Sequence, residues 1–439
     1  MATTTTSTDS ADRKPEAQDI HMGADTALEK GPAVSGNNDS VQEFPEGGVR
    51  AWMVATGTAL IMFSTLGYVN SWGVYQAYYE THQLSDHSPD QIAWIGSLQG
   101  FFVFAGGLVG GPMFDRWGAK VIRPGALLYV VSQMMTSLCK KYWQFMLAQG
   151  VLGGISLGLT MCPSMAATPQ YFNQKRAAAM GMAIAGSSIG GVVWPIALSK
   201  MLNNSSLGFG WSVRIVGFIL LGVLTYATLA IKARLPPRKS GFLLPGAFKE
   251  PVYTISIVAC FFLFMGMFTP FFFLPTYALT KGMNQTLAGY LLAILNGASF
   301  PGRVIPGILA DKLGRFNMFF FSAIASGIIT LCWTKCESNA GIIVFAIFFG
   351  FASGAIVSGA SVTLASCPKD PKNIGTYMGM GLFLASFAAL ISPPINGALV
   401  RKEDGVLHMS ILSGVLLLFG SVVVLVAKAV SPAGLWSRT

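Results

Sequence analysis

One short pattern occurs twice in this chain, beginning at position 111 and again at position 307, an offset of 196 residues. The two copies read Gly111-Pro-Met-Phe-Asp115-Arg116-Trp-Gly118 and Gly307-Ile-Leu-Ala-Asp311-Lys312-Leu-Gly314. Each copy ends a long apolar segment and is closely followed by a further basic residue. A charged turn of constant spacing that joins two apolar segments once in each half indicates a duplicated membrane protein. In many transporters such a duplication supplies two helical bundles around a central site.

A second pair of segments repeats at nearly the same offset, 198 residues. The matching segments are Met180-Gly181-Met182 followed by Pro195, and Met378-Gly379-Met380 followed by Pro393. The two offsets are almost equal, so we infer a parallel repeat in which each half of the chain contains six spans.

The composition agrees with a membrane protein. Hydrophobic residues make up 52% of the chain and charged residues only 11%, whereas a soluble domain carries about 25% charge. The net charge is +10, but the basic residues occupy short loops between apolar segments, so they indicate topology and no nucleic-acid partner. The six cysteines show no metal-binding spacing and are expected to pack as small apolar residues. No nucleotide-binding or nucleophile motif occurs, so we expect neither a cofactor nor an enzyme.

Apolar segments of about 20 residues, the length needed to cross a bilayer, recur along the chain. The sequence therefore predicts an all-α integral membrane protein with twelve transmembrane helices in two six-helix bundles. The predicted spans are 49–77, 91–114, 121–139, 143–167, 177–201, 211–232, 252–278, 287–310, 317–335, 340–366, 374–400 and 406–428. The predicted parts are a disordered cytosolic tail (1–44), the first bundle (45–232), a cytosolic linker (233–250), the second bundle (251–430) and a short tail (431–439).

The distribution of lysine and arginine predicts the orientation. If the N-terminus is cytosolic, 20 of the 29 basic residues lie on the cytosolic side and 8 on the outer side, so both termini are expected in the cytosol. That orientation places the sequons at Asn203, Asn204 and Asn284 outside, where glycosylation is possible.

The repeated turn resembles the most specific marker of the major facilitator superfamily, and the resemblance covers about residues 45–430. It implies the major facilitator fold. It also implies that the turn aspartate lies against a helix end of the opposite bundle and stabilises one conformation. A carboxylate near a helix N-terminus gains about 0.3–1 kcal/mol, and more when partly buried. The residues of this expected conformational latch are Gly111, Asp115, Arg116, Gly118, Gly307, Asp311, Lys312 and Gly314. The alternative is that they only form a tight charged turn.

Two further segments narrow the resemblance. Pro45-Glu46-Gly47-Gly48-Val-Arg-Ala51-Trp52 precedes the first span, and Tyr171–Ser187 leads into the fifth. Both are similar to signatures of the monocarboxylate transporter (monocarboxylate porter) family in the form typical of fungal members. Physically, Gly181 and Ala185 provide a small-residue face for close helix packing. The resemblance implies transport of organic acids.

Arg303 is the strongest candidate for binding the transported molecule. It lies eight residues before Asp311, or about 12 Å at 1.5 Å per residue, and an arginine at mid-span costs about 2.5–3.5 kcal/mol or more. Asn296 and Ser299 share its helix face, and the first half has Gly107 at the equivalent position. A guanidinium suits a carboxylate because of its forked geometry. The resemblance implies that an arginine four residues before Gly307, which is Arg303 here, binds the carboxylate of the substrate. The alternative is a structural arginine packed on carbonyl groups.

The chain differs from the animal members of the monocarboxylate transporter family at two places. Ser299 stands where they have an aspartate, and the region containing Tyr68 and Asn70 has no lysine. No acid or histidine lies at a span centre, so a buried proton relay is not expected. Facilitated passage of an organic anion, exchange of anions, or a proton carried by the substrate itself fits the sequence better than proton symport through the protein. Tyr68 and Asn70 complete the predicted substrate-binding set with Arg303, Asn296 and Ser299.

The sequence thus predicts a secondary active or facilitative transporter of small organic anions (monocarboxylates) or specialised metabolites, working by alternating access. One alternative is an efflux transporter of a fungal secondary metabolite. Another is a non-transporting membrane sensor, which would need a longer signalling tail or loop. The expected partners are a small organic acid or amphiphilic metabolite and the lipid bilayer. We expect a multi-pass protein of the plasma membrane that functions as a monomer. Import and export both remain open.

Overall fold

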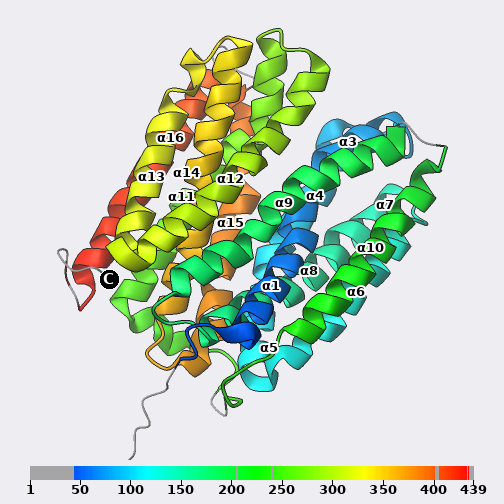
Figure 1. Ribbon diagram of the computed structural model, residues 1–439. Helices are drawn as coiled ribbons and strands as arrows, with labels where there is room; N and C mark the ends of the chain where they lie inside the picture. The colour runs from blue at the N-terminus through cyan, green and yellow to red at the C-terminus, as the bar shows by residue number, and fades with distance from the viewer. Residues whose placement is uncertain (1–43, 204–205, 239–240, 401–404, 433, 435–439) are drawn as a thin grey trace, which may run out of the picture. The chain divides into compact units, whose positions relative to one another are not determined.

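The computed structural model describes residues 44–203, 206–238, 241–400, 405–432 and 434. Nearly all of the predicted N-terminal tail and most of the C-terminal tail lie outside these residues. Residues Phe44–Thr439 form one compact unit, so the division into two bundles stays a prediction. For clarity, α1–α10 are called the N-terminal half and α11–α16 the C-terminal half (Figure 1).

The N-terminal half is helical throughout its described spans. Its elements are α1 (Gly48–Ser64), α2 (Leu66–Val69), α3 (Trp72–Thr81), α4 (Pro89–Ala105), α5 (Gly107–Trp117), the 3-10 helix η1 (Gly118–Val121), α6 (Ile122–Thr136), α7 (Tyr142–Phe145), the π-helix η2 (Met146–Gly153), α8 (Gly154–Ala167), the 3-10 helix η3 (Thr168–Gln170), α9 (Arg176–Asn203) and α10 (Gly208–Ala230).

The C-terminal half has longer uninterrupted helices. Its elements are the 3-10 helix η4 (Pro245–Lys249), α11 (Pro251–Thr280), α12 (Gln285–Leu313), α13 (Arg315–Leu331), the 3-10 helix η5 (Trp333–Lys335), α14 (Asn339–Ser366), the 3-10 helix η6 (Pro371–Asn373), α15 (Ile374–Val400) and α16 (Gly405–Val430).

Within the described residues, ten helical segments are long and apolar enough to cross a membrane. One of them, Gln91–Thr136, has 46 residues, which is about 69 Å of helix and twice the thickness of a bilayer core. It contains two spans, α4–α5 and α6, separated by η1. The apolar helix Arg315–Leu331 has 17 residues, fewer than any of the ten, and supplies one more span. The fold is therefore all-helical and consistent with the predicted twelve spans.

Two spans are less regular than the sequence predicts. The first is interrupted at Thr65, whose backbone leaves the helical region (φ −103°, ψ −90°), and again at Asn70 and Ser71. The fourth is π-helical over Met146–Gly153. Gaps in the regular hydrogen-bond ladder of this kind are frequent at functional sites. Here they lie in the half of the chain that carries Tyr68 and Asn70.

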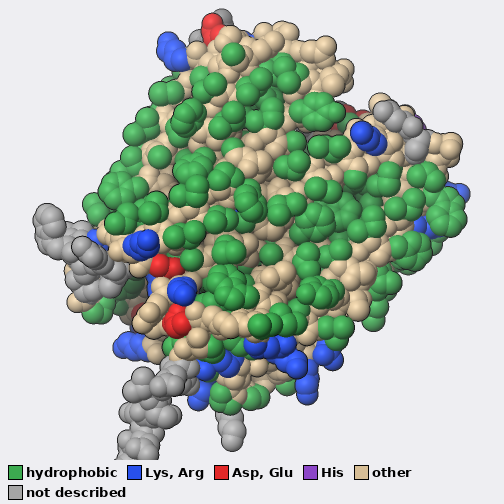
Figure 2. Space-filling view, viewed as in Figure 1, with side chains coloured by type: hydrophobic (Ala, Val, Ile, Leu, Met, Phe, Trp, Pro, Cys, Tyr) green, Lys and Arg blue, Asp and Glu red, His purple; other side chains and the backbone are tan. Residues whose placement is uncertain are grey.

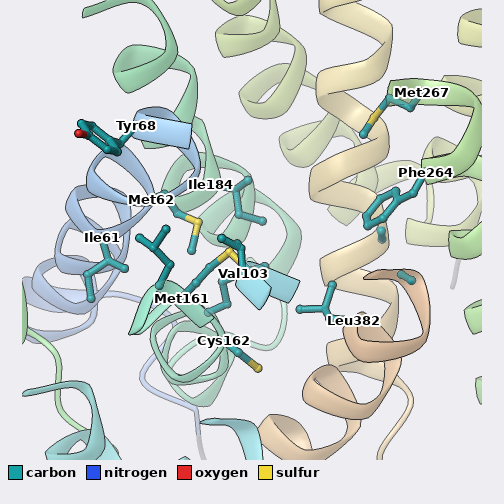
Figure 3. Packing of buried hydrophobic residues seen from close by; sticks show 14 of the residues in the cluster. Ile61, Met62, Tyr68, Val103, Met161, Cys162, Ile184, Phe264, Met267 and Leu382 are labelled. Atoms are coloured by element: carbon teal, nitrogen blue, oxygen red, sulfur yellow. The ribbon is translucent and has the colours of Figure 1, made fainter. Parts of the chain in front are cut away.

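The interior of the described unit is predominantly apolar, with polar side chains buried among the hydrophobic ones. Figure 3 shows Met62 of α1, Val103 of α4, Met161 of α8 and Ile184 of α9 converging, while Leu382 of α15 faces them from the C-terminal half. Many large apolar side chains are exposed on the outer surface instead, where they suit contact with lipid. On the face drawn in Figure 2, hydrophobic side chains cover the middle and most lysines and arginines gather at the end where α5 and α6 lie.

Candidate functional site

The carboxylate of Asp115 joins the two halves of the chain. Asp115 lies in the last turn of α5, because α5 continues to Trp117 and ends at Gly118, which has a positive φ of 67°. Its Oδ1 accepts from the backbone N–H of Gly375 (2.9 Å), and its Oδ2 accepts from the N–H (2.6 Å) and the hydroxyl (2.7 Å) of Thr376. Gly375 and Thr376 begin α15, so the carboxylate caps that helix where backbone N–H groups lack partners. We call this arrangement the first latch.

Asp311 makes the reciprocal connection. It lies in the last turn of α12, and its two carboxylate oxygens accept from the backbone N–H groups of Ala177 (3.0 Å) and Ala178 (2.8 Å). These residues begin α9, in the N-terminal half. We call this arrangement the second latch. The duplicated aspartates therefore cap duplicated helices, each in the opposite half of the chain.

The glycines of the repeated pattern allow this close approach. A Cβ atom on Gly111 would lie 2.0 Å from the carbonyl oxygen of Gly375, and one on Gly307 would lie 2.8 Å from that of Ala177. Either side chain would separate the helices. Gly314 ends α12 with φ 103°, as Gly118 ends α5.

The basic residues of the pattern do not take part in the latches. Arg116 and Lys312 are exposed and make no hydrogen bond or ion pair with other described residues. Two other arginines approach the aspartates instead, Arg238 at 3.8 Å from Asp115 and Arg315 at 3.8 Å from Asp311.

Arg303 lies between the halves. It is 5% exposed and projects from α12 toward α9, where its Nη1 donates to the carbonyl oxygen of Ile184 (3.0 Å) and to the hydroxyl of Ser187. None of the ion pairs among the described residues includes Arg303, and its Nε has no partner there. The guanidinium thus retains a hydrogen-bond donor and an unneutralised charge in the interior.

The other predicted site residues divide into two groups. Asn296 is buried on the same helix and accepts from the side-chain amide of Asn70 (3.2 Å), which again joins the two halves. Ser299 is buried against Gly354 of α14, and its hydroxyl has no described partner. Tyr68 is further removed, because its hydroxyl bonds with Tyr75 (2.5 Å) and Gln133 within the N-terminal half. The structure therefore brings together Arg303, Asn296 and Asn70 along the contact of α9 with the C-terminal half.

The sequons differ in their surroundings. Asn203 is exposed at the end of α9, and Asn284 is exposed and caps α12 by accepting from the backbone N–H of Thr286 (2.8 Å). Asn204 lies outside the described residues. Within the described part of the chain, no group of three or more histidine, cysteine or acidic residues could hold a metal ion.

Glu46 makes a contact that the sequence did not reveal. Its carboxylate accepts from the backbone N–H groups of Asn173 (2.8 Å), Gln174 (2.8 Å) and Lys175 (3.1 Å), just before α9. Among the described residues it is the one non-glycine residue with a positive φ (51°), a conformation that tertiary contacts must hold. The two segments similar to monocarboxylate transporter signatures therefore contact each other. The acidic residue before Gly47-Gly48 was the available signal.

Changing Glu46 to glutamine is expected to lower stability by about 1 kcal/mol, because a charged acceptor of three N–H groups becomes a neutral amide. Burial raises the pKa of Glu46, but the three backbone hydrogen bonds and the nearby charge of Arg176 outweigh it, so the folded pKa lies below its ordinary value. Because the pKa of Glu46 is lower in the folded protein than in the unfolded chain, ionised Glu46 stabilises the fold at pH values above the unfolded pKa. This stabilisation is lost as the pH falls through the folded pKa. The difference between wild type and variant in thermal unfolding should therefore vanish in acid. Glu337→Gln, at an exposed ion pair with Lys281, is the control and should change stability little.

Comparisons with known proteins identify the family of this chain. The profile of the Major Facilitator Superfamily matches residues 52–393. The chain is 54% identical over 393 residues to the aspyridones efflux protein apdF of Emericella nidulans, covering 90% of this chain and 80% of that relative. It is 37% identical over 416 residues to the agnestins efflux protein AgnL12 of Paecilomyces divaricatus, and the match covers 93% of this chain and 94% of that relative.

Two solved structures share the fold. The human organic anion transporter MFSD10 (TETRAN) matches with a TM-score of 0.69 at 14% identity, covering 85% of this chain and 99% of that one. The proton:xylose symporter XylE matches with a TM-score of 0.69 at 13% identity, covering 85% and 94%. At this identity they show the fold alone. The family profile spans most of the chain, and the two relatives are matched over 80% and 94% of their own length, so the chain belongs to the Major Facilitator Superfamily and is a multi-pass membrane transporter.

Proposed function

We propose that this transporter exports an amphiphilic specialised metabolite that carries an acidic or other hydrogen-bond-accepting group. The observation that carries the proposal is Arg303, a buried cation between the two halves with an unused donor and no ion-pair partner among the described residues. A buried charge is costly unless it is paired, so a transported anion is the natural partner. The relatives named as efflux proteins of aspyridones and agnestins support export of a metabolite of this kind.

Alternating access gives the two latches a role. Both connect the halves through helix N-termini, and both lie at the end of the molecule that the basic loops assign to the cytosol. We infer a conformation closed toward the cytosol, in which the route to Arg303 opens on that side only when Asp115 and Asp311 release their helices. The proposal places the protein in the plasma membrane, with both termini cytosolic, working as a monomer of two six-helix bundles.

Transport of small monocarboxylates is a second candidate function, and it depends on the same arginine. The spacing Arg303-Val-Ile-Pro-Gly307 and the two signature-like segments favour membership of the monocarboxylate porter family. The contact between Glu46 and the backbone before α9 gives those segments a shared structural role. The two candidates differ in the size of the substrate and not in the group that Arg303 binds. The proposed topology, with both termini in the cytosol, places Asn203 and Asn284 on the outer side of the membrane, where we propose that they can be glycosylated.

A comparison of metabolites inside and outside cells tests the function. In the native host, a strain without the gene is compared with the same strain carrying the wild-type copy, and extracts and media are measured by mass spectrometry. Export predicts that at least one metabolite with an acidic group accumulates in the cells and declines in the medium, and that the wild-type copy reverses both. Accumulation in the medium alone would indicate uptake and contradict the proposed direction.

A further inference from the structure

Arg238 lies in the segment between the two halves, directly after Pro236-Pro237 and before α11. A basic side chain in such a segment is ordinarily exposed to solvent, but Arg238 is 5% exposed. Its backbone N–H donates to the carbonyl oxygen of Asp115 (2.8 Å), so the segment is fixed to the end of α5. The linker arginine is therefore part of the interior at the first latch.

The guanidinium of Arg238 contacts three parts of the protein at once. Its Nη1 donates to the hydroxyl of Thr376 (2.7 Å) and the side-chain oxygen of Asn373 (3.2 Å), at the start of α15. Its Nη2 donates to the carbonyl oxygens of Gly241 and Phe242, each at 2.8 Å, further along the same segment. The carboxylate of Asp115 lies 3.8 Å from Nη1.

These contacts orient the hydroxyl of Thr376. A hydroxyl has one hydrogen, and that of Thr376 accepts from Arg238 and donates to Asp115 Oδ2. The arginine thus determines the direction in which the hydroxyl donates. It also places a positive charge beside a carboxylate whose side chain is 0% exposed, and such a carboxylate is unfavourable when unpaired.

The second latch obtains its arginine differently. Arg315 follows Asp311 by four residues and lies 3.8 Å from it, and no described residue of the linker contacts Asp311. At the repeat offset of 196 residues, the position equivalent to Arg315 is Ala119. The first copy of the pattern therefore has no arginine at the position equivalent to Arg315, and Arg238 lies beside Asp115 instead.

We propose that Arg238 is a positioning residue for transport, which couples the segment between the halves to the first latch and stabilises the conformation closed on that side. The inference rests on the proposed alternating-access function. It makes the two latches unequal, because only the first depends on the path of the linker. Movement of the linker then opens the first latch and leaves the contacts of Asp311 in place.

Cys162 provides a reporter for this conformation. It is fully buried on α8, where its thiol faces the carbonyl oxygen of Gly375 at 4.0 Å and packs beside Gly107. Separation of α15 from α5 would expose it to a small alkylating reagent. Cys260 is equally buried but lies on α11 within the C-terminal half, and it serves as the internal control.

The test measures alkylation of Cys162 by N-ethylmaleimide in the purified full-length protein, without substrate, by peptide mass spectrometry. Arg238→Ala is expected to raise the rate of Cys162 alkylation by about tenfold or more. Arg238→Lys should raise it by less, because lysine keeps the charge but loses the forked guanidinium that donates to several acceptors. The matched control is Arg234→Ala in the same segment, whose Nε donates to the carbonyl oxygen of Gln170 and which makes no hydrogen bond to the described residues of the latch. It should leave the rate unchanged.

A second-site variant separates the proposed role from general loss of structure. Adding Ala119→Arg to Arg238→Ala returns an arginine to the position equivalent to Arg315, and should slow alkylation again. The proposal is overturned if a folded Arg238→Ala or Arg238→Lys protein reacts at the wild-type rate, or if Ala119→Arg restores nothing. The alkylation measurement needs no substrate, so its result is independent of the metabolite comparison. The role of Arg238 can therefore be contradicted while export is supported, and export can be contradicted while the role of Arg238 is supported.

Discussion

Replacement of Arg303 by alanine is expected to weaken binding of the exported metabolite by about 10- to 100-fold, while the protein still folds and reaches the membrane. The reason is the unused donor at its Nε and the absence of an ion-pair partner among the described residues. A hydrogen bond between charged groups contributes about 1.5–3 kcal/mol, and alanine removes it entirely. The measurement is binding of the metabolite found in the export test to purified protein, together with its export from cells.

Two matched variants distinguish substrate binding from a structural role of Arg303. Arg303→Lys keeps the charge but loses the forked geometry, so affinity should be intermediate. Ser187→Ala keeps the guanidinium and removes only the hydroxyl that accepts from Nη1, so affinity should remain close to wild type. If both Arg303→Ala and Ser187→Ala raise the alkylation rate of Cys162 while affinity is unchanged, Arg303 only joins α12 to α9 and the site assignment is wrong.

The positions of the spans were predictable from the sequence because they depend on local composition. The predicted span 374–400 coincides with α15 (Ile374–Val400), and 340–366 differs from α14 (Asn339–Ser366) by one residue. A long apolar run bounded by charged or turn-forming residues has few alternatives in a membrane. The second span was predicted to end at 114, but α5 extends to Trp117, so Asp115 belongs to the helix and not to the turn. The helix end is set by Gly118, whose positive φ was not readable from hydropathy.

The contacts that define the site were less predictable because they join segments distant in sequence. The sequence identified Arg303 from the cost of a charge at mid-span, but its contacts with Ile184 and Ser187 depend on how α9 and α12 pack. It grouped Tyr68 with Arg303, whereas the tyrosine hydroxyl is used within the N-terminal half.

Arg238 is one of the 20 basic residues that the sequence assigns to the cytosolic side, and its charge there predicts topology alone, although one further comparison was available from the sequence. The offset that pairs the two patterns also pairs Arg315 with Ala119, so the missing arginine could have been noticed. Nothing in the composition of the linker indicates that a particular basic residue there is buried. That follows from the hydrogen bonds of Arg238 to the start of α15 and to the end of α5.

Replacement of Asp115 by asparagine is expected to have the largest effect on the conformational equilibrium. Both carboxylate oxygens accept hydrogen bonds, from Gly375 on one side and from Thr376 on the other. An amide keeps one acceptor but turns its NH₂ group toward a backbone N–H, and it also removes the charge that pairs with Arg238. The loss should destabilise the closed conformation by about 2 kcal/mol or more, which is roughly 30-fold in population. Alkylation of Cys162 should rise accordingly, and export should fall.

The same change at Asp311 offers a comparison within one molecule. Asp311 accepts two backbone hydrogen bonds against the three hydrogen bonds of Asp115, and its side chain is 10% exposed against 0%. Water can partly replace its lost contacts, so Asp311→Asn should destabilise the closed conformation less than Asp115→Asn. Arg116→Gln, beside Asp115 but exposed and without a described partner, should leave both alkylation and export near wild type. If Asp311→Asn had the greater effect, or if Asp115→Asn matched Arg116→Gln, burial and hydrogen-bond number would not determine the strength of the latches. The repeated aspartates would then act only in the charged turns.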